Sequence, residues 1–456
     1  MMLVGFSVGN FKSFDVVQSI SFLPSKIIRH KEHIANLGNH RVLKSGLIFG
    51  ANASGKSNLI QAVSFSRNII VRGLDKVDLS KKYFRIRNQN YNKPGIFEYH
   101  IIVNEKAYIY GIEISYSKQE IISEWLCRLE DKSKKKVYLF KRNVDESGIS
   151  NVETDIKRIS KDVSERVSVY FEDFSNNISD TLRKKTMLSD IAMRGNDKTG
   201  ILKEIFDVCN WFEKFLVIFP DSKYVLLNEL GTNENERQFF QNVMNYLDTG
   251  IETIENQSQE MDFDKLFKDM PEEIVEKYKI KFYSNTVGEF VTVRLRDQIV
   301  SLHKDENGNL VYNKLFLGHG NKNDKFEYND ESDGTKRLFD LIPLLYNKRE
   351  NLVIFIDEID RSFHTKLSKK FLDLFYEKNE EEQGQLIATT HDAYLLDQDL
   401  IRQDEIWFVE RQQDHSSKIF SLSGFKERFD KKIDKEYLLG RYGAVPIFGK
   451  NIRKKN

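Results

Sequence analysis

The residues best suited to chemistry form a glycine-rich loop near the N-terminus of the chain. The loop follows the apolar run 47–49 and precedes a helix-like run, 58–68. A G-x-x-x-x-G-K-[ST] pattern in this context lets backbone N–H groups surround a phosphate, while the lysine reaches β- and γ-phosphate oxygens and the serine binds Mg²⁺. The predicted nucleotide-binding residues are Gly50, Ala51, Asn52, Ala53, Ser54, Gly55, Lys56 and Ser57.

Two acids follow a second apolar run. Residues 352–356 are continuously apolar, as in a parallel strand buried on both faces, and Asp357 and Glu358 come next. We expect Asp357 to hold Mg²⁺ beside Ser57, directly or through water, and Glu358 to polarise an attacking water. Paired acids after a strand are otherwise usually a solvated strand end. The phosphate loop in the same chain favours the catalytic interpretation.

A third segment lies about twenty residues before this strand and is followed by the helix-like run 336–345. It contains Ser332, Asp333 and Gly334. The N-terminus of a helix binds anions because its first N–H groups are free and its dipole is positive there. We predict that this segment contacts the γ-phosphate held by a second copy of the chain. A simple helix N-cap is the structural alternative.

A fourth element ends in a histidine. Residues 385–390 have the composition of another buried strand, and His391 follows about thirty residues after Asp357. In this position an imidazole is predicted to contact the γ-phosphate and respond to its hydrolysis. The alternative is an ordinary loop histidine.

In this order and spacing, the four elements resemble the ABC-type ATPase heads of the RecF/SMC/OLD kind. More narrowly, the chain resembles the AAA15/AAA21-type ATPases of bacterial phage-defence and abortive-infection operons, such as the Septu, PARIS and RloA/AbiL-like ATPase subunits. The stretches that carry this second resemblance are Asn10-Phe11-Lys12-Ser13-Phe14, Gly50 to Asn58, Glu331-Ser332-Asp333-Gly334-Thr335, and Tyr437 to Pro446.

The resemblance implies a fold, a mechanism and partners. The fold would be an α/β P-loop NTPase head of the ABC type, with a mixed sheet, an antiparallel β subdomain and an inserted α-helical domain. Lys56, Glu358 and His391 would be catalytic, with ATP and Mg²⁺ bound at composite sites in a homodimer or higher homo-oligomer. A separate effector, a nuclease or toxin, is implied as partner. Residues 359–364 stand where such heads carry a dimer-crossing loop, and Gln89 is the candidate for the glutamine that couples the lobes.

The remaining pattern predicts three segments. Residues 1–145 form an N-terminal ATPase lobe with a hairpin over 97–114, residues 146–284 a helical insert, and residues 285–456 a C-terminal lobe with strands at 290–295, 299–303 and 311–317. Within the insert, helices are predicted over 152–182, 201–218, 235–247 and 263–279.

Composition limits the alternatives. With 40% hydrophobic and 30% charged residues, and no long apolar run, the chain is expected to be a cytoplasmic globular protein without a membrane span. The two cysteines have no metal-binding spacing. The net charge of +1 gives no overall support for nucleic acid, although local basic runs near 134–142 and 453–455 leave it open as a partner.

Other functions remain open on the sequence. A RecF/SMC-like DNA repair or recombination ATPase would share all four motifs. A transporter's nucleotide-binding subunit is disfavoured by the large insert, and an inactive scaffold by the presence of Glu358 and His391. The 65 residues after His391 lack the spaced acids of a TOPRIM nuclease, so a nuclease activity in the same chain is not expected.

Overall fold

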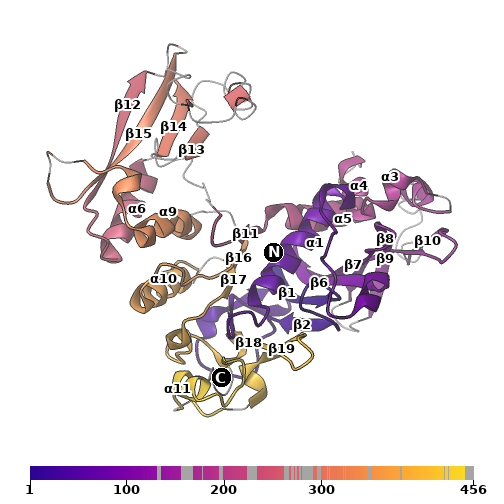
Figure 1. Cartoon of the computed structure of the whole chain (residues 1–456). Helices are drawn as coiled ribbons and strands as arrows, with labels where there is room; N and C mark the ends of the chain where they lie inside the picture. Colours follow the sequence, from indigo (N-terminus) through magenta and orange to yellow (C-terminus); the bar gives the residue numbers. More distant parts are fainter. Residues whose placement is uncertain are drawn as a thin grey trace, which may run out of the picture. The chain divides into compact units, whose positions relative to one another are not determined.

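The structure is a computed structural model of the whole chain (Figure 1). It describes residues 1–446 apart from 131–134, 156–167, 177, 195–198, 223–233, 261–266, 269–271, 273–274, 277–278, 280–290, 295–298, 306, 308, 322, 324, 347–351, 380–382, 426 and 430. Among the described residues, no helix is both long and apolar enough to cross a lipid bilayer.

Two compact units make up the chain, and each is discontinuous in sequence. The first contains Met1–Pro220, Glu350–Asp360 and Tyr376–Asn456, and the second contains Asp221–Arg349 and Arg361–Phe375. The phosphate loop, the paired acids and the histidine therefore share the first unit, whereas the Glu331–Thr335 segment belongs to the second.

A six-stranded sheet in the first unit positions the candidate site. Its strand order is β11-β16-β17-β5-β18-β19, with every neighbouring pair parallel except β18 and β19. Because parallel strands share one direction, the carboxyl ends of β5, β16 and β17 lie at the same edge of the sheet. The strands are β5 (Ser45–Phe49), β11 (Leu216–Ile218), β16 (Val353–Ile356), β17 (Gln385–Thr389), β18 (Ile406–Arg411) and β19 (Ser417–Ser421).

A seven-stranded antiparallel sheet, in the order β10-β9-β8-β7-β6-β1-β2, completes the β structure of this unit together with a small hairpin, β3–β4. The predicted hairpin over 97–114 is confirmed as β6 and β7. The strands are β1 (Met2–Gly9), β2 (Gln18–Ser21), β3 (Ile34–Leu37), β4 (His40–Leu43), β6 (Pro94–Val103), β7 (Lys106–Ser115), β8 (Glu120–Leu129), β9 (Lys136–Val144) and β10 (Ser150–Glu153).

One continuous hydrophobic core joins the two sheets through the first helix after the phosphate loop. Side chains of this helix such as Ile60 and Val63 are buried with Tyr99 of β6 and Trp211 of α5. The helices of the unit include α1 (Lys56–Arg72), α3 (Asp180–Arg183), α4 (Met187–Arg194), α5 (Gly200–Lys214) and α11 (Ile433–Leu438). The phosphate loop is thereby held between a buried strand and a buried helix.

The second unit combines a four-stranded antiparallel sheet, in the order β12-β15-β14-β13, with helices. Phe240 and Phe339, from two of these helices, pack with Leu317 of the sheet in a separate core. The elements are α6 (Glu234–Tyr246), β12 (Thr253–Glu260), β13 (Val291–Arg294), β14 (Ile299–Lys304), β15 (Leu310–Gly318), α9 (Asp333–Tyr346) and the first part of α10 (Thr365–Lys378).

The helical prediction for residues 146–284 is wrong in part. Val152 lies in strand β10, and the predicted helix over 201–218 ends at Lys214, after which Leu216–Ile218 form strand β11. Apolar residues at helical spacing can also alternate along a strand, and here hydrogen bonding to β9 and β16 decided between the two. Most of the predicted helix over 263–279, and residues 156–167, lie outside the described residues.

Candidate nucleotide-binding site

The phosphate loop turns tightly between β5 and α1. Gly55 is the residue before the helix and has φ 113°, a left-handed conformation that glycine adopts without the steric penalty of a Cβ. A Cβ here would also collide with the hydroxyls of Ser13 and Ser417. Ala53 has φ 60° and lies in the same region without being glycine. The loop thus leads directly into the N-terminus of a 17-residue helix, whose first N–H groups have no partner within the helix.

Lys56 lies inside this loop rather than in solvent. Its ammonium nitrogen Nζ donates hydrogen bonds to the carbonyls of Gly50 at 2.6 Å and Ala51 at 3.1 Å. Burial lowers the pKa of Lys56 from 10.5 to about 8, and the nearby charges of Asp357, Asp360 and Glu358 oppose that shift. The lysine is therefore mainly protonated at neutral pH, as a phosphate-binding lysine must be.

Asp357 lies at the carboxyl end of β16, within hydrogen-bonding distance of the serine after the lysine. The hydroxyl of Ser57 donates to its Oδ1 at 3.1 Å, and the hydroxyl of Thr389 donates to the same oxygen at 2.6 Å. The backbone N–H of Asp357 donates to the carbonyl oxygen of Ile218 in β11 at 2.8 Å. Two strands and a helix therefore fix the position of this carboxylate.

Glu358 has an unusual backbone conformation. Its φ is 54°, in the left-handed region, which costs a residue other than glycine on the order of 1–2 kcal/mol. Its N–H donates to the hydroxyl of Thr389 at 2.8 Å, and its carboxylate Oε1 lies 3.8 Å from Nε2 of His391. Such strain, held in place by a specific hydrogen bond, is typical of a functional position.

His391 completes the group, and its hydrogen bonds define its tautomer. Lys56 Nζ, which can only donate, lies 3.3 Å from His391 Nδ1, so Nδ1 accepts and Nε2 carries the proton, directed toward Glu358. The backbone N–H of His391 donates to Asp360 at 3.1 Å. Burial and the charge of Lys56 lower the pKa of His391, against the opposing effect of Asp360 and the two paired acids. The imidazole is consequently neutral at neutral pH.

The structure thus brings together five of the residues predicted from the sequence: Lys56, Ser57, Asp357, Glu358 and His391. Sequence reasoning missed Thr389, which contacts both paired acids. It placed Asp360 in the expected dimer-crossing loop but did not predict that Asp360 accepts the backbone N–H of His391. A threonine at the end of an apolar strand beside a predicted site histidine was the available signal for Thr389.

The segment Asn10–Phe14, one of the stretches that carry the family resemblance, also contacts the phosphate loop. The hydroxyl of Ser13 accepts a hydrogen bond from Asn58 of α1 at 2.8 Å. Ser417 of β19 lies 2.8 Å from the Ser13 hydroxyl and 2.5 Å from the carbonyl oxygen of Ser54. The segment therefore supports the loop from outside.

The donor set fits a magnesium nucleotide. Adjacent hydroxyl and carboxylate oxygens, from Ser57 and Asp357, are the ligands that Mg²⁺ prefers. In the loop itself, the hydroxyl oxygen of Ser54 is buried and makes no hydrogen bond within the described part of the chain. A cationic lysine and a helix N-terminus surround the same space.

The Glu331–Thr335 segment caps helix α9 in the second unit. The hydroxyl of Ser332 accepts the N–H of Thr335 at 3.1 Å, which is an N-cap hydrogen bond. Ser332 and Asp333 are exposed, and a Cβ on Gly334 would lie 2.8 Å from the carbonyl oxygen of Ser362. The N-cap alternative is therefore correct as a description of structure, and the exposed cap leaves a contact with another molecule open.

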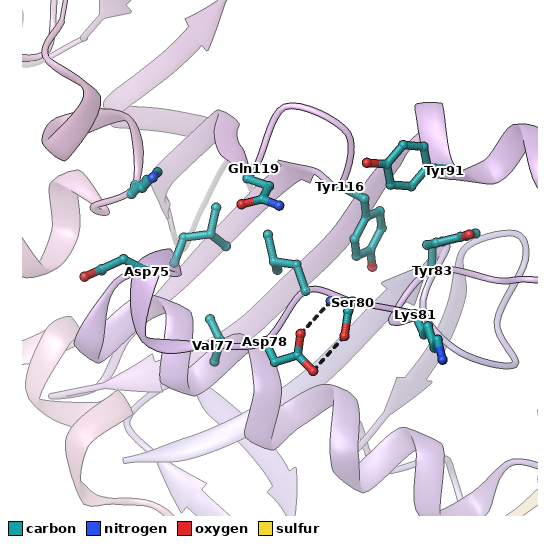
Figure 2. Close-up of a pocket in the computed structure, with 12 residues that line it drawn as sticks. Asp75, Val77, Asp78, Ser80, Lys81, Tyr83, Tyr91, Tyr116 and Gln119 are labelled. Carbon is teal, nitrogen blue, oxygen red and sulfur yellow. Dashed lines mark hydrogen bonds between the residues drawn. The ribbon is translucent and has the colours of Figure 1, made fainter.

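A separate pocket of about 540 Å³ lies between the chain that follows α1 and the turn that joins β7 to β8 (Figure 2). Three tyrosines, Tyr83, Tyr91 and Tyr116, line it together with Asp78. Asp78 accepts two hydrogen bonds from Ser80, drawn in Figure 2, and the Tyr116 hydroxyl donates to the Asn10 carbonyl at 2.8 Å. None of the residues predicted from the sequence lines this pocket. Gln89 lies exposed in the neighbouring turn Asn88–Asn92.

The topology and the site define an α/β P-loop ATPase fold of the ABC type, with its phosphate loop after β5 and its paired acids after β16. More specifically, the chain belongs to the AAA_21 family, described as "AAA domain, putative AbiEii toxin, Type IV TA system", which matches residues 47–182 and 210–397. A search of curated proteins found no match.

Distant likenesses to solved structures accompany the family match. The SmcHead bound to the C-winged helix domain of ScpA is 15% identical, with 94% of this chain and 100% of that chain covered and a TM-score of 0.40. The SMC head domain from Thermotoga maritima is 12% identical, with 92% and 99% covered and a TM-score of 0.37. At this distance the fold assignment depends on the topology described above.

Proposed function

We propose that the protein is an ATP-binding and ATP-hydrolysing switch. The observation that carries the proposal is the meeting of Lys56, Ser57, Asp357, Glu358 and His391 at one edge of the parallel sheet. Separate motifs of the sequence contribute these groups. A lysine, a hydroxyl beside a carboxylate, and a second carboxylate beside a histidine are the group types that phosphoryl transfer from ATP uses.

Each residue has a distinct task in this proposal. Lys56 binds the β- and γ-phosphate oxygens through its charge, and Ser57 and Asp357 provide the oxygen ligands for Mg²⁺. When bound, Mg²⁺ neutralises charge that develops on the phosphate oxygens. Glu358 orients the attacking water. The Nε2–H of His391, which faces Glu358, donates a hydrogen bond to the γ-phosphate.

The second unit contributes to a neighbouring copy in this proposal. Ser332, Asp333 and Gly334, at the exposed N-terminus of α9, close over the γ-phosphate bound by another chain. The active assembly is then a homodimer or higher homo-oligomer. ATP favours the closed assembly because only there does the exposed cap contribute to binding, so occupancy shifts the population between two states.

We further propose that this switch controls a separate effector in an antiviral, abortive-infection system. The family description, which names a putative AbiEii toxin of a Type IV TA system, supports a role of this class. The effector would respond to the change between open and closed assemblies.

The composite site is tested by mixing two inactive variants. Lys56→Ala removes the positive charge that binds the phosphates. It is expected to lower ATP turnover by roughly 10²-fold or more. Ser332→Asp keeps an N-cap oxygen for α9 but adds a negative charge that repels the γ-phosphate. Mixed pairs contain one site with an intact Lys56 from one chain and an intact Ser332 from the other, so mixing is expected to restore part of the turnover.

Ser332→Asn is the matched control, because asparagine caps the helix equally well without adding charge. It should retain far more turnover than Ser332→Asp. A Lys56→Ala protein with unchanged turnover would refute the assignment of the phosphate loop. Mixed oligomers, verified by mass, that recover no turnover would refute the composite site.

A further inference from the structure

A second cluster of metal-ligand side chains lies near the amino end of strand β5, whereas the phosphate loop follows the carboxyl end of the same strand. His30, Glu32 and His33 occupy the turn before β3, and one ligand atom from each lies within 4.8 Å of the other two. They are connected to Ser45, the first residue of β5, through the buried carboxylate of Glu405. None of these residues takes part in the site described above.

Hydrogen bonds identify one proton-bearing nitrogen on each of the two histidines. Nε2 of His30 lies 2.9 Å from the carbonyl oxygen of Gln398, which can only accept, so Nε2 carries a proton and Nδ1, which lies 3.2 Å from Glu32, is the nitrogen left to bind a metal. Nδ1 of His33 lies 2.9 Å from a carboxylate oxygen of Glu405, so this nitrogen is the donor and Nε2 has the lone pair. A partner of this kind on the second ring nitrogen is what a metal-binding histidine usually has.

The second ring nitrogens of both histidines lie near one carboxylate oxygen, where a bound cation would replace a shared proton. Oε1 of Glu32 lies 3.2 Å from His30 Nδ1 and 3.9 Å from His33 Nε2. Ligand atoms about 2.0–2.1 Å from a tetrahedral ion are about 3.3 Å apart, so small side-chain rotations bring all three into range. Two imidazoles and one carboxylate, with an open fourth position, are a donor set for Zn²⁺.

The surroundings are rigid on the protein side and open on the solvent side. The His33 side chain is 3% exposed, and its ring stacks on Tyr376 with a centroid distance of 3.6 Å and an angle of 10°. The Glu32 side chain is 45% exposed, which provides an entry path and space for a water ligand. The buried cation Arg402, which contacts the carbonyl oxygen of His30, is paired with Asp404 at 2.8 Å and 2.9 Å.

We propose that His30, Glu32 and His33 form a binding site for one Zn²⁺ ion per chain, with Glu405 and the Gln398 carbonyl as the partners that orient the two histidines. The bound ion joins three side chains of the turn before β3, whose histidines also contact the C-terminal segment through Gln398 and Glu405. The site is independent of the nucleotide chemistry proposed above.

The test is direct metal binding to the full-length protein. Chelator-treated protein is titrated with Zn²⁺ in excess Mg²⁺, which occupies oxygen sites and competes poorly for imidazole. Calorimetry and elemental analysis after gel filtration are expected to give one zinc per chain, and thermal melting to show a higher midpoint with zinc. Glu32→Gln should weaken zinc binding at least tenfold and remove the zinc-dependent rise in midpoint.

His30→Asn is the second variant, because asparagine tolerates the left-handed backbone of this position, φ 50° and ψ 55°, and lacks the imidazole. It should also lose at least tenfold in affinity. Lys31→Gln, on the same turn, and Glu146→Gln, an exposed carboxylate elsewhere, are controls that should bind like the unmodified protein. Absence of zinc binding at micromolar concentrations, or equal affinity in all four variants, would overturn the proposal.

Discussion

Thr389 provides the sharpest test of how the site is held together. Its hydroxyl donates to Asp357 at 2.6 Å and accepts the N–H of Glu358 at 2.8 Å, so one side chain positions both acids. Thr389→Val keeps the shape of the side chain and removes both hydrogen bonds. We expect the variant to fold, to bind Mg²⁺-ATP more weakly and to hydrolyse it more slowly.

The magnitude follows from the two contacts. A hydrogen bond to a charged group contributes about 1.5–3 kcal/mol, and loss of a partner that orients a metal ligand typically lowers metal affinity or activity about 10–100-fold, which corresponds to about 1.4–2.7 kcal/mol. The two estimates agree. The unpaired N–H of Glu358 adds a cost of about 1–3 kcal/mol to stability, in a backbone that is already in the left-handed region.

The assay is kcat/KM for ATP as a function of Mg²⁺ concentration, with urea unfolding of the same proteins. Thr389→Ser retains the hydroxyl and should restore both measurements. Thr390→Val is the matched control. The Thr390 hydroxyl accepts the N–H of Asp392, and the hydrogen bonds to Asp357 and Glu358 come from Thr389 instead. If Thr389→Val required no more Mg²⁺ and turned over as fast as Thr389→Ser, the positioning role of Thr389 would be refuted.

Three further outcomes are expected. Because the pKa of Lys56 is lowered to about 8 and the protonated form binds phosphate, kcat/KM should fall as pH rises through 8, about tenfold per unit at higher pH, in a pH–rate profile with saturating Mg²⁺; a flat profile to about pH 9.5 would contradict this. Glu358→Gln should bind ATP but not hydrolyse it, so a closed assembly accumulates, and light scattering that shows no ATP-dependent association would count against the switch. Gly334→Ala should lower the free energy of unfolding by about 1–3 kcal/mol in urea melts, because the added Cβ would press on the Ser362 carbonyl. Gly424→Ala is the control and should be neutral, since no atom lies within 4 Å of the added Cβ. Equal effects of the two substitutions would exclude the close contact as the cause.

The sequence predicted the groups of the site because each is tied to a local pattern. Lys56 and Ser57 are the last two residues of a phosphate-loop motif. Asp357 comes directly after a continuous apolar run, which in the structure is strand β16. Thr389 could not be predicted in its role, because its two hydrogen bonds cross from β17 to the neighbouring strand. Which strands are neighbours is a property of the sheet and not of any one segment.

The same distinction applies to the fold. Local periodicity was sufficient for the β6–β7 hairpin, where strand alternation and a short turn are both encoded in consecutive residues. It failed at Leu216–Ile218, which extends an apolar helical pattern in the sequence but forms the edge strand that holds the backbone of Asp357. An apolar residue lowers the free energy by burial in either conformation, so the sequence alone indicated that this segment is at least partly buried. The tertiary structure decided its conformation, because the edge of β16 offers the backbone hydrogen bonds that a strand needs.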